Sequence, residues 1–112
     1  MGHETAKKTD AESVMPEEYG GMWFLKEQLG ATNVGLTILE LEPGATGKEH
    51  DESESGQEEI YYVVEGTIEV SVGSKTTQLG PDEAIRVDPQ ERRKIENTGD
   101  EPAKLVLVGG PL

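Results

Sequence analysis

An all-β barrel or sandwich of short strands is the fold class that this sequence predicts. Three observations lead to it. The 14 glycines and 6 prolines among 112 residues divide the chain into short pieces. Apolar and polar residues alternate along several of these pieces, and we find no convincing helix. Hydrophobic residues make up 33% of the chain, with one Trp and one Phe, so one modest core must be built from Val, Ile and Leu.

The chain opens with a polar, aperiodic segment, residues 1–15, for which we predict a disordered or arm-like tail. A single domain over residues 16–112 is expected to follow. His3 lies in the tail, and we assign it no role. The first apolar run is Met22–Leu25. Core packing is expected for its Trp and Phe, with a plug at one barrel end or a dimer contact as the alternatives.

Strands are expected along most of the remaining chain. The first shows alternating apolar residues, at Val34, Leu36, Ile38 and Leu41, and ends at a Pro-Gly pair. Turn residues at Gly73-Ser74 and in NTGDEP separate later β-rich runs. These runs are Ile60–Val64, Thr67–Val72, and the stretches at residues 75–80, 83–87, 93–97 and 103–110.

The charge of the chain excludes several classes of partner. Acidic residues outnumber basic ones 23 to 10, which gives a net charge of −13. Nucleic acids and anionic membranes both require a basic surface, so neither is expected as a partner. The sequence has no cysteine, which excludes disulfides and thiolate metal sites. It also shows no apolar run of membrane-spanning length and no signal peptide, so we expect a soluble, cytoplasmic protein.

A candidate site lies just before the run Ile60–Val64. His50 stands there among six carboxylates, Glu49, Asp51, Glu52, Glu54, Glu58 and Glu59. Residues two apart on an extended strand face the same way, so His50 and Glu52 can point together. Glu59 and Tyr61 would share one face of the next strand by the same rule. One imidazole with two carboxylates is a plausible ligand set for Mn, Fe or Zn.

Two stretches resemble the paired motifs of the cupin superfamily. In the first, Gly44 precedes His50 by six residues, and Glu59 precedes Gly66 by seven within EEIYYVVEG. The second is LGPDEAIRVDPQERRKIENTGDEPAKLVLV, with its opening Gly, its Pro near the expected turn and its Asn. The resemblance implies a single cupin barrel, also called a double-stranded β-helix or a jelly-roll-like barrel.

The metal set that the resemblance implies is present only in part. Cupins commonly use three histidines and one glutamate, and His50 and Glu59 match the first histidine and the glutamate. Glu52 occupies the second histidine position, where Glu54 could compete with it, and Arg93 occupies the last. A guanidinium stays protonated and donates no lone pair. At about 5 Å from a divalent ion it would oppose binding by roughly 6–7 kcal/mol at an effective dielectric of about 20.

Three hypotheses about function follow. In the first, the pocket holds no cofactor and binds a small, anionic ligand at a degenerate metal site through Arg93, Glu59, His50 and Tyr61. In the second, the protein is a metal-dependent oxygenase, isomerase or hydrolase with Mn, Fe, Zn or Ni on His50, Glu52 and Glu59. In the third, Arg93 pairs with a glutamate and the barrel is a non-catalytic scaffold.

A homodimer is also expected. The resemblance implies paired barrels, and sheet edges and outward apolar residues favour covering by a second copy. Ile60 and Tyr62 are the outward residues that the alternation predicts, together with the apolar run Met22–Leu25.

Overall fold

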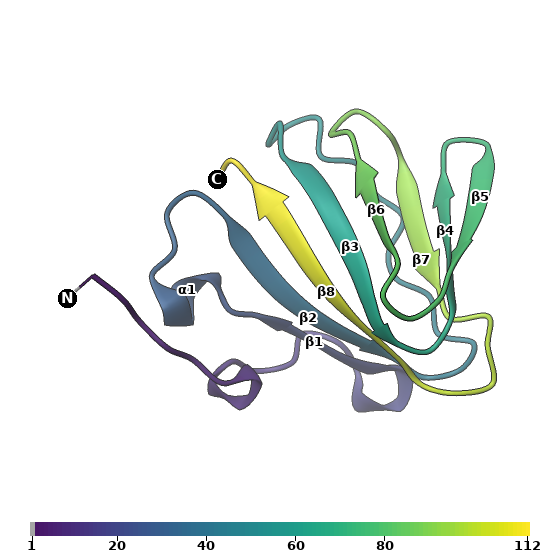
Figure 1. Cartoon of the computed structure of the whole chain (residues 1–112), viewed down its shortest axis with the longest axis horizontal. Coiled ribbons are helices and arrows are strands. Elements are labelled where there is room, and N and C mark those ends of the chain that lie inside the picture. Colours follow the sequence, from purple (N-terminus) through teal and green to yellow (C-terminus); the bar gives the residue numbers. More distant parts are fainter. Residues whose placement is uncertain (1) are drawn as a thin grey trace.

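The computed structural model describes residues 2–112 and folds them into two antiparallel β-sheets (Figure 1). Five strands form the larger sheet in the order β1-β2-β8-β3-β6, and three form the smaller in the order β5-β4-β7. The all-β architecture that the sequence predicts is therefore confirmed. The strands are β1 (Gly20–Phe24), β2 (Gly35–Leu41), β3 (Glu58–Glu65), β4 (Ile68–Val72), β5 (Lys75–Leu79), β6 (Ala84–Val87), β7 (Arg93–Glu96) and β8 (Ala103–Gly110).

Strand β3 shows how residue alternation builds the barrel. Tyr61 and Val63 are buried, whereas Ile60, Tyr62 and Val64 are exposed. This is the two-residue period of a strand with one face on the core and the other in water. The predicted outward positions of Ile60 and Tyr62 are confirmed.

The apolar residues that the sequence pattern identifies along β2 do not all lie on one face of the strand. Leu39 and Leu41 are its buried residues, while Val34, just before the strand, is half exposed. Because side chains alternate strictly, the inward face of Leu39 and Leu41 cannot also include Leu36 and Ile38. The register between β2 and β8, which pairs Leu39 with buried Leu105, selects the inward face.

The core lies where the buried faces of both sheets meet. It is aliphatic, as the composition predicts, with Tyr61 as its one aromatic member. It includes Leu39, Leu41, Tyr61, Val63, Val87, Leu105 and Leu107 from the five-stranded sheet, and Ile68, Val70, Leu79 and Ile95 from the three-stranded sheet.

Two residues of the sequence motifs have clear structural reasons. Gly66 follows β3 with a φ of +84°, and a Cβ there would lie 2.7 Å from the Cα of Ala103. Only glycine therefore fits between β3 and the start of β8. Asn97 is fully buried, and its Nδ2 donates to the carbonyl oxygens of Leu41 and Glu101, each at 2.9 Å. The side chain thus closes the turn before β8.

A short helix, α1 (Lys26–Leu29), contradicts the prediction that the chain has none. It is a single turn that ends at Gly30, whose φ of +63° permits the left-handed cap. Four residues are too few for a helical period to show in the sequence, which explains the miss. Two 3-10 turns, η1 (Lys8–Asp10) and η2 (Glu17–Tyr19), precede it. No helix within residues 2–112 is long and apolar enough to cross a membrane.

Within its described residues, 2–15, the predicted N-terminal tail contacts the five-stranded sheet at Lys8 and at Val14. Lys8 Nζ is 2.8 Å from a carboxylate oxygen of Glu40 and 4.2 Å from the ring centre of Trp23. Further along, the Val14 N–H donates to the Met22 carbonyl at 2.9 Å. The segment thus runs as an arm beside edge strand β1, and its mobility in solution stays a prediction.

Candidate functional site

Backbone pairing brings the loop before β3 against β7. The His50 N–H donates to the Arg93 carbonyl at 3.0 Å, and the Arg93 N–H donates back to His50 at 2.8 Å. Residues that exchange both bonds in an antiparallel pair project their side chains to the same face. His50 and Arg93 therefore lie side by side, and both line the cavity of the barrel.

A compact group of metal-binding side chains forms around the His50 ring. Nε2 lies 3.2 Å from a Glu52 carboxylate oxygen and 3.6 Å from Glu59 Oε1. One ligand atom from each of the three residues lies within 4.8 Å of the others. His50 Nδ1 is 3.0 Å from the Lys48 carbonyl, and when Nδ1 donates a proton there, Nε2 is the ring nitrogen that could bind a metal ion.

Arg93 lies behind this group and is fully buried. Its Nη2 donates to the Asp88 carbonyl at 2.8 Å, and its Nη1 lies 3.7 Å from Glu59 Oε1. Nε and Nη1 have no hydrogen-bond partner among the described residues. A guanidinium without exposed surface compensates the Glu59 charge rather than touching a ligand in this conformation. The bidentate contact between Arg93 and an anionic ligand stays a prediction, because the Arg93 side chain would first have to move into the cavity.

Tyr61 holds Glu59 from the core side. Its hydroxyl donates to Glu59 Oε1 at 2.7 Å. Burial and the adjacent Glu59 carboxylate raise the pKa of Tyr61 far above its usual range. The hydroxyl therefore stays protonated and acts as a fixed donor, which orients Glu59 toward His50.

The structure distinguishes the two glutamates of the loop. Glu52 faces the pocket, where the Ser55 hydroxyl donates to its Oε1 at 2.8 Å and the Glu52 N–H donates to the Pro89 carbonyl at 2.8 Å. Glu54 is exposed and does not line the pocket. Sequence spacing alone left both possible.

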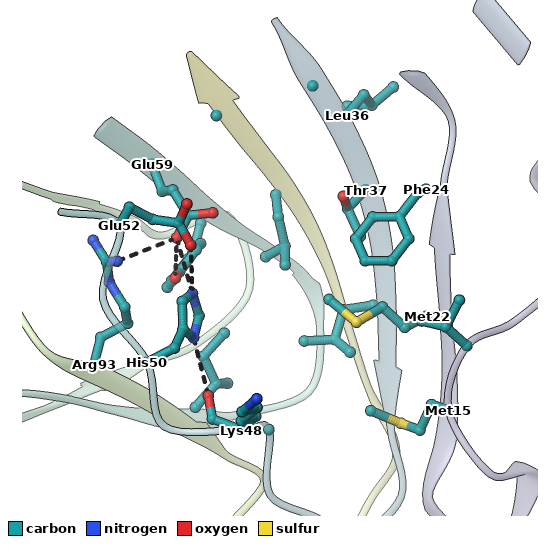
Figure 2. A pocket seen from close by; sticks show the side chains of 18 of the residues that line it. Met15, Met22, Phe24, Leu36, Thr37, Lys48, His50, Glu52, Glu59 and Arg93 are labelled. Atoms are coloured by element: carbon teal, nitrogen blue, oxygen red, sulfur yellow. Dashed lines mark hydrogen bonds and ion pairs between the residues drawn. The ribbon is translucent and has the colours of Figure 1, made fainter. Parts of the chain in front are cut away.

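A cavity of about 740 Å³ opens in front of these residues. Figure 2 shows the charged group on one side and Met15, Met22 and Phe24 on the other. Phe24 is half exposed in the cavity wall, so the expected core packing of this ring is wrong. The spacing of Met22 and Phe24, two apart on a strand, was the signal that could have identified this wall.

Sequence comparison finds relatives in Streptomyces. The chain is 37% identical over 84 residues to the tetracenomycin polyketide synthase protein TcmJ of Streptomyces glaucescens, a match that covers 75% of this chain and 55% of that protein. It is 34% identical over 84 residues to the polyketide synthase CurC of Streptomyces cyaneus, covering 75% and 53%. The chain thus spans about half the length of these curated relatives.

Solved structures share the fold at lower identity. A cupin protein from Bacteroides fragilis superposes with a TM-score of 0.81 at 18% identity, covering 99% of this chain and 86% of that one. A predicted oxalate decarboxylase from Thermotoga maritima gives 0.78 at 22% identity, covering 96% and 99%. The model of the cupin domain family matches residues 37–109. With the two motifs and the two-sheet barrel, this match shows that the chain belongs to the cupin domain family.

Proposed function

We propose that this protein binds a small amphipathic anion in the barrel cavity, with the acidic group of the ligand beside Lys48, at the His50 end. The observation that carries the proposal is the division of one cavity into a charged side and an apolar side. Ligand pockets commonly combine apolar walls with a few convergent polar groups that fix orientation. The size of the cavity, about 740 Å³, suits a ligand of several rings.

The charge of the cavity lining favours an anion. Apart from buried Arg93, three lysines and three glutamates line it, so the lining is far less negative than a chain whose acidic residues outnumber the basic ones 23 to 10. Lys26 and Lys48 belong to the lining, and neither has a carboxylate within 4.0 Å among residues 2–112. Unpaired lysines beside a pocket in so acidic a chain attract negative ligands and repel cationic ones.

The relatives narrow the class of ligand. Two of them are named as polyketide synthase proteins. Polyketides are carbon skeletons that carry carbonyl and hydroxyl oxygens, and aromatic ones combine flat apolar rings with acidic oxygens. An aromatic hydroxy acid is therefore a suitable probe for this pocket.

Calorimetric titration of 1-hydroxy-2-naphthoate and of its neutral amide tests the proposal. We expect the acid to bind about tenfold or more tightly than the amide, because a charged hydrogen-bond acceptor gains more from the basic lining. Lys48→Gln should lower the affinity for the acid by about two- to fivefold. Lys75→Gln is the matched control, since Lys75 is an exposed lysine of β5 outside the lining. Equal binding of acid and amide, or none, would contradict the proposal.

A second candidate function is a metal-dependent enzyme, which the arrangement of His50, Glu52 and Glu59 favours. Three ligand atoms within 4.8 Å of one another match the spacing that a divalent ion needs. Arg93 opposes the ion, as its charge is held next to Glu59. When bound, such an ion would supply Lewis-acid chemistry to a ligand oxygen. His50, Glu52 and Glu59 would hold it, and Tyr61 and Arg93 would orient Glu59.

Metal analysis and ligand titration together distinguish three hypotheses: an anion-binding protein, a metal-dependent enzyme and a non-catalytic scaffold. Elemental analysis of the purified protein should find about one equivalent of Mn, Fe, Zn or Ni per chain if the second function holds, and a His50→Ala variant should lose it. Binding of the naphthoate to chelator-treated protein supports the first function alone. A protein that binds neither metal nor acid would agree with a salt-bridged scaffold.

A further inference from the structure

Much of the apolar side of the cavity is built by a segment that precedes the residues matched by the cupin domain model, which begins at residue 37. We call this segment, residues 14–24, the N-terminal wall. Six of its residues line the cavity: Val14, Met15, Pro16, Tyr19, Met22 and Phe24. The charged side, formed by His50, Glu52, Glu59 and Arg93, lies within the matched residues. One cavity therefore has two walls from different parts of the chain.

Hydrogen bonds hold the N-terminal wall in place. The Val14 N–H donates to the Met22 carbonyl at 2.9 Å, and the Met22 N–H donates to Ser13 Oγ at 3.0 Å. The Glu42 N–H donates to the Tyr19 carbonyl at 3.0 Å. Met15 and Met22 also pack against the hydrophobic core. The wall is thus part of the folded barrel, which gives it a defined position opposite His50.

The wall exposes more apolar surface than packing requires. Val14 is 61% exposed, Tyr19 50% and Phe24 48%, and all three line the cavity. Exposed apolar side chains that gather at one cavity mark a binding surface rather than a solvated one. A ligand that covers them would gain the free energy of removing this surface from water.

The side chains of the wall suit a flat, polarizable body. Phe24 and Tyr19 offer aromatic faces, and Met15 and Met22 offer flexible thioethers that contact aromatic rings favourably. Figure 2 shows Phe24, Met22 and Met15 in a row along one side of the cavity, facing the His50 group. A rigid ligand anchored by an acidic group at His50 would therefore extend its rings toward this row.

We propose that the N-terminal wall selects the ligand by the size of its apolar body, and that it favours acids with two or more fused aromatic rings over one-ring acids. This proposal rests on the proposed function, because the acidic group must be held at the charged side. It assigns selectivity to Phe24, with Met15 and Met22 beside it.

The experiment compares 1-hydroxy-2-naphthoate with salicylate by calorimetric titration. Both carry the same ortho-hydroxy carboxylate, and they differ by one fused ring. The naphthoate should bind at least about tenfold more tightly, because one added apolar group in a fitting pocket gives discrimination of this order. Phe24→Ala should remove most of that preference by weakening the naphthoate about five- to tenfold while leaving salicylate within about twofold.

Ile60→Ala is the matched control for Phe24→Ala. Ile60 is 42% exposed on strand β3 and does not line the cavity, so its removal should leave the preference unchanged. Met15→Ala provides a second variant of the wall, outside strand β1, and its preference for the naphthoate should fall as well. Thermal melts of all variants check that each is folded.

Three results would overturn the inference. If both acids bind native protein equally, the wall selects nothing, although the proposed function stands. If Phe24→Ala lowers the affinity for both acids by the same factor, the residue affects the charged side of the cavity or the fold. If neither acid binds, the proposed function fails and this inference fails with it.

Discussion

The two sides of the cavity differ in how they are held and in what they can do. At the charged side, His50, Glu59 and Arg93 are fixed by one another, by Tyr61 and by backbone pairing between the loop and β7. At the apolar side, Phe24 and Tyr19 are half exposed. The charged side is suited to anchoring one functional group of a ligand. The apolar side is suited to discriminating between ligands by the size of their apolar rings. A protein can therefore keep its anchoring chemistry while its N-terminal wall changes the ligand.

Arg93→His should give the largest effect and acts on the charged side alone. It removes the guanidinium next to Glu59 and supplies a neutral nitrogen on the strand that pairs with His50. Divalent affinity should rise well over tenfold, because each 1.4 kcal/mol is about a factor of ten and the repulsion removed is roughly 6–7 kcal/mol. Calorimetric titration of Mn²⁺, Ni²⁺ and Zn²⁺ measures it.

Arg93→Met serves as the control for that variant, since it removes the charge and adds no metal ligand. Its divalent affinity should lie between those of native protein and Arg93→His. Tight binding of one equivalent by the native protein, unchanged in Arg93→His, would show that Arg93 does not oppose the ion. The metal-dependent enzyme would then be the better hypothesis.

Glu52→Gln should lower divalent affinity by about tenfold, because it replaces a carboxylate ligand with a neutral amide. Glu54→Gln makes the same chemical change two residues later, on an exposed side chain outside the cavity, and should change affinity by less than about twofold. The same titrations apply, on the Arg93→His background if native protein binds too weakly. A larger loss in Glu54→Gln would mean that the loop presents the other glutamate.

A third prediction concerns the outer face of the five-stranded sheet, which is distinct from both sides of the cavity. We predict a homodimer that buries this face and leaves the N-terminal wall free. Residues paired in register across it form an apolar row: Trp23, Ile38, Val106 and Tyr62. Tyr62→Lys should therefore halve the mass measured by light scattering, whereas Phe24→Lys should not.

The dimer prediction has a direct check in the native protein. A monomeric mass at high protein concentration would exclude it. Loss of the dimer in Phe24→Lys but not in Tyr62→Lys would place the interface on the N-terminal wall, and the wall would then be covered in the assembly.

Added salt should give the smallest effect. It should raise the stability of the fold and lower the affinity for the anionic ligand. The net charge of −13 destabilises the folded state by self-repulsion, so the melting temperature should rise by a few degrees, roughly, between low and molar KCl. Binding of 1-hydroxy-2-naphthoate should weaken over the same range, because the attraction of the basic lining is screened. A flat or falling melting temperature would show that the acidic residues are too far apart to repel.

Much of the charged side could be predicted from local spacing. The two-residue period of β3 places Glu59 and Tyr61 on one face, and the structure has them hydrogen-bonded. The choice between Glu52 and Glu54 could not be predicted, since it depends on contacts of the loop with Ser55 and Pro89. The sequence analysis did not identify the N-terminal wall. It assigned residues up to 15 to a tail and interpreted Met22–Leu25 as a run packed in the core, so it did not connect the two.

The sequence by itself determined the β architecture, the turns at Gly73-Ser74 and Asn97 and the inward residues of β3. Alternation and glycine conformation act over a few neighbouring residues, so they can be read without a partner strand. The tertiary structure alone decided that Arg93 is buried against Glu59 and that Phe24 faces His50 across a cavity. Both depend on strand register and on packing between segments far apart in the chain, which no local pattern specifies.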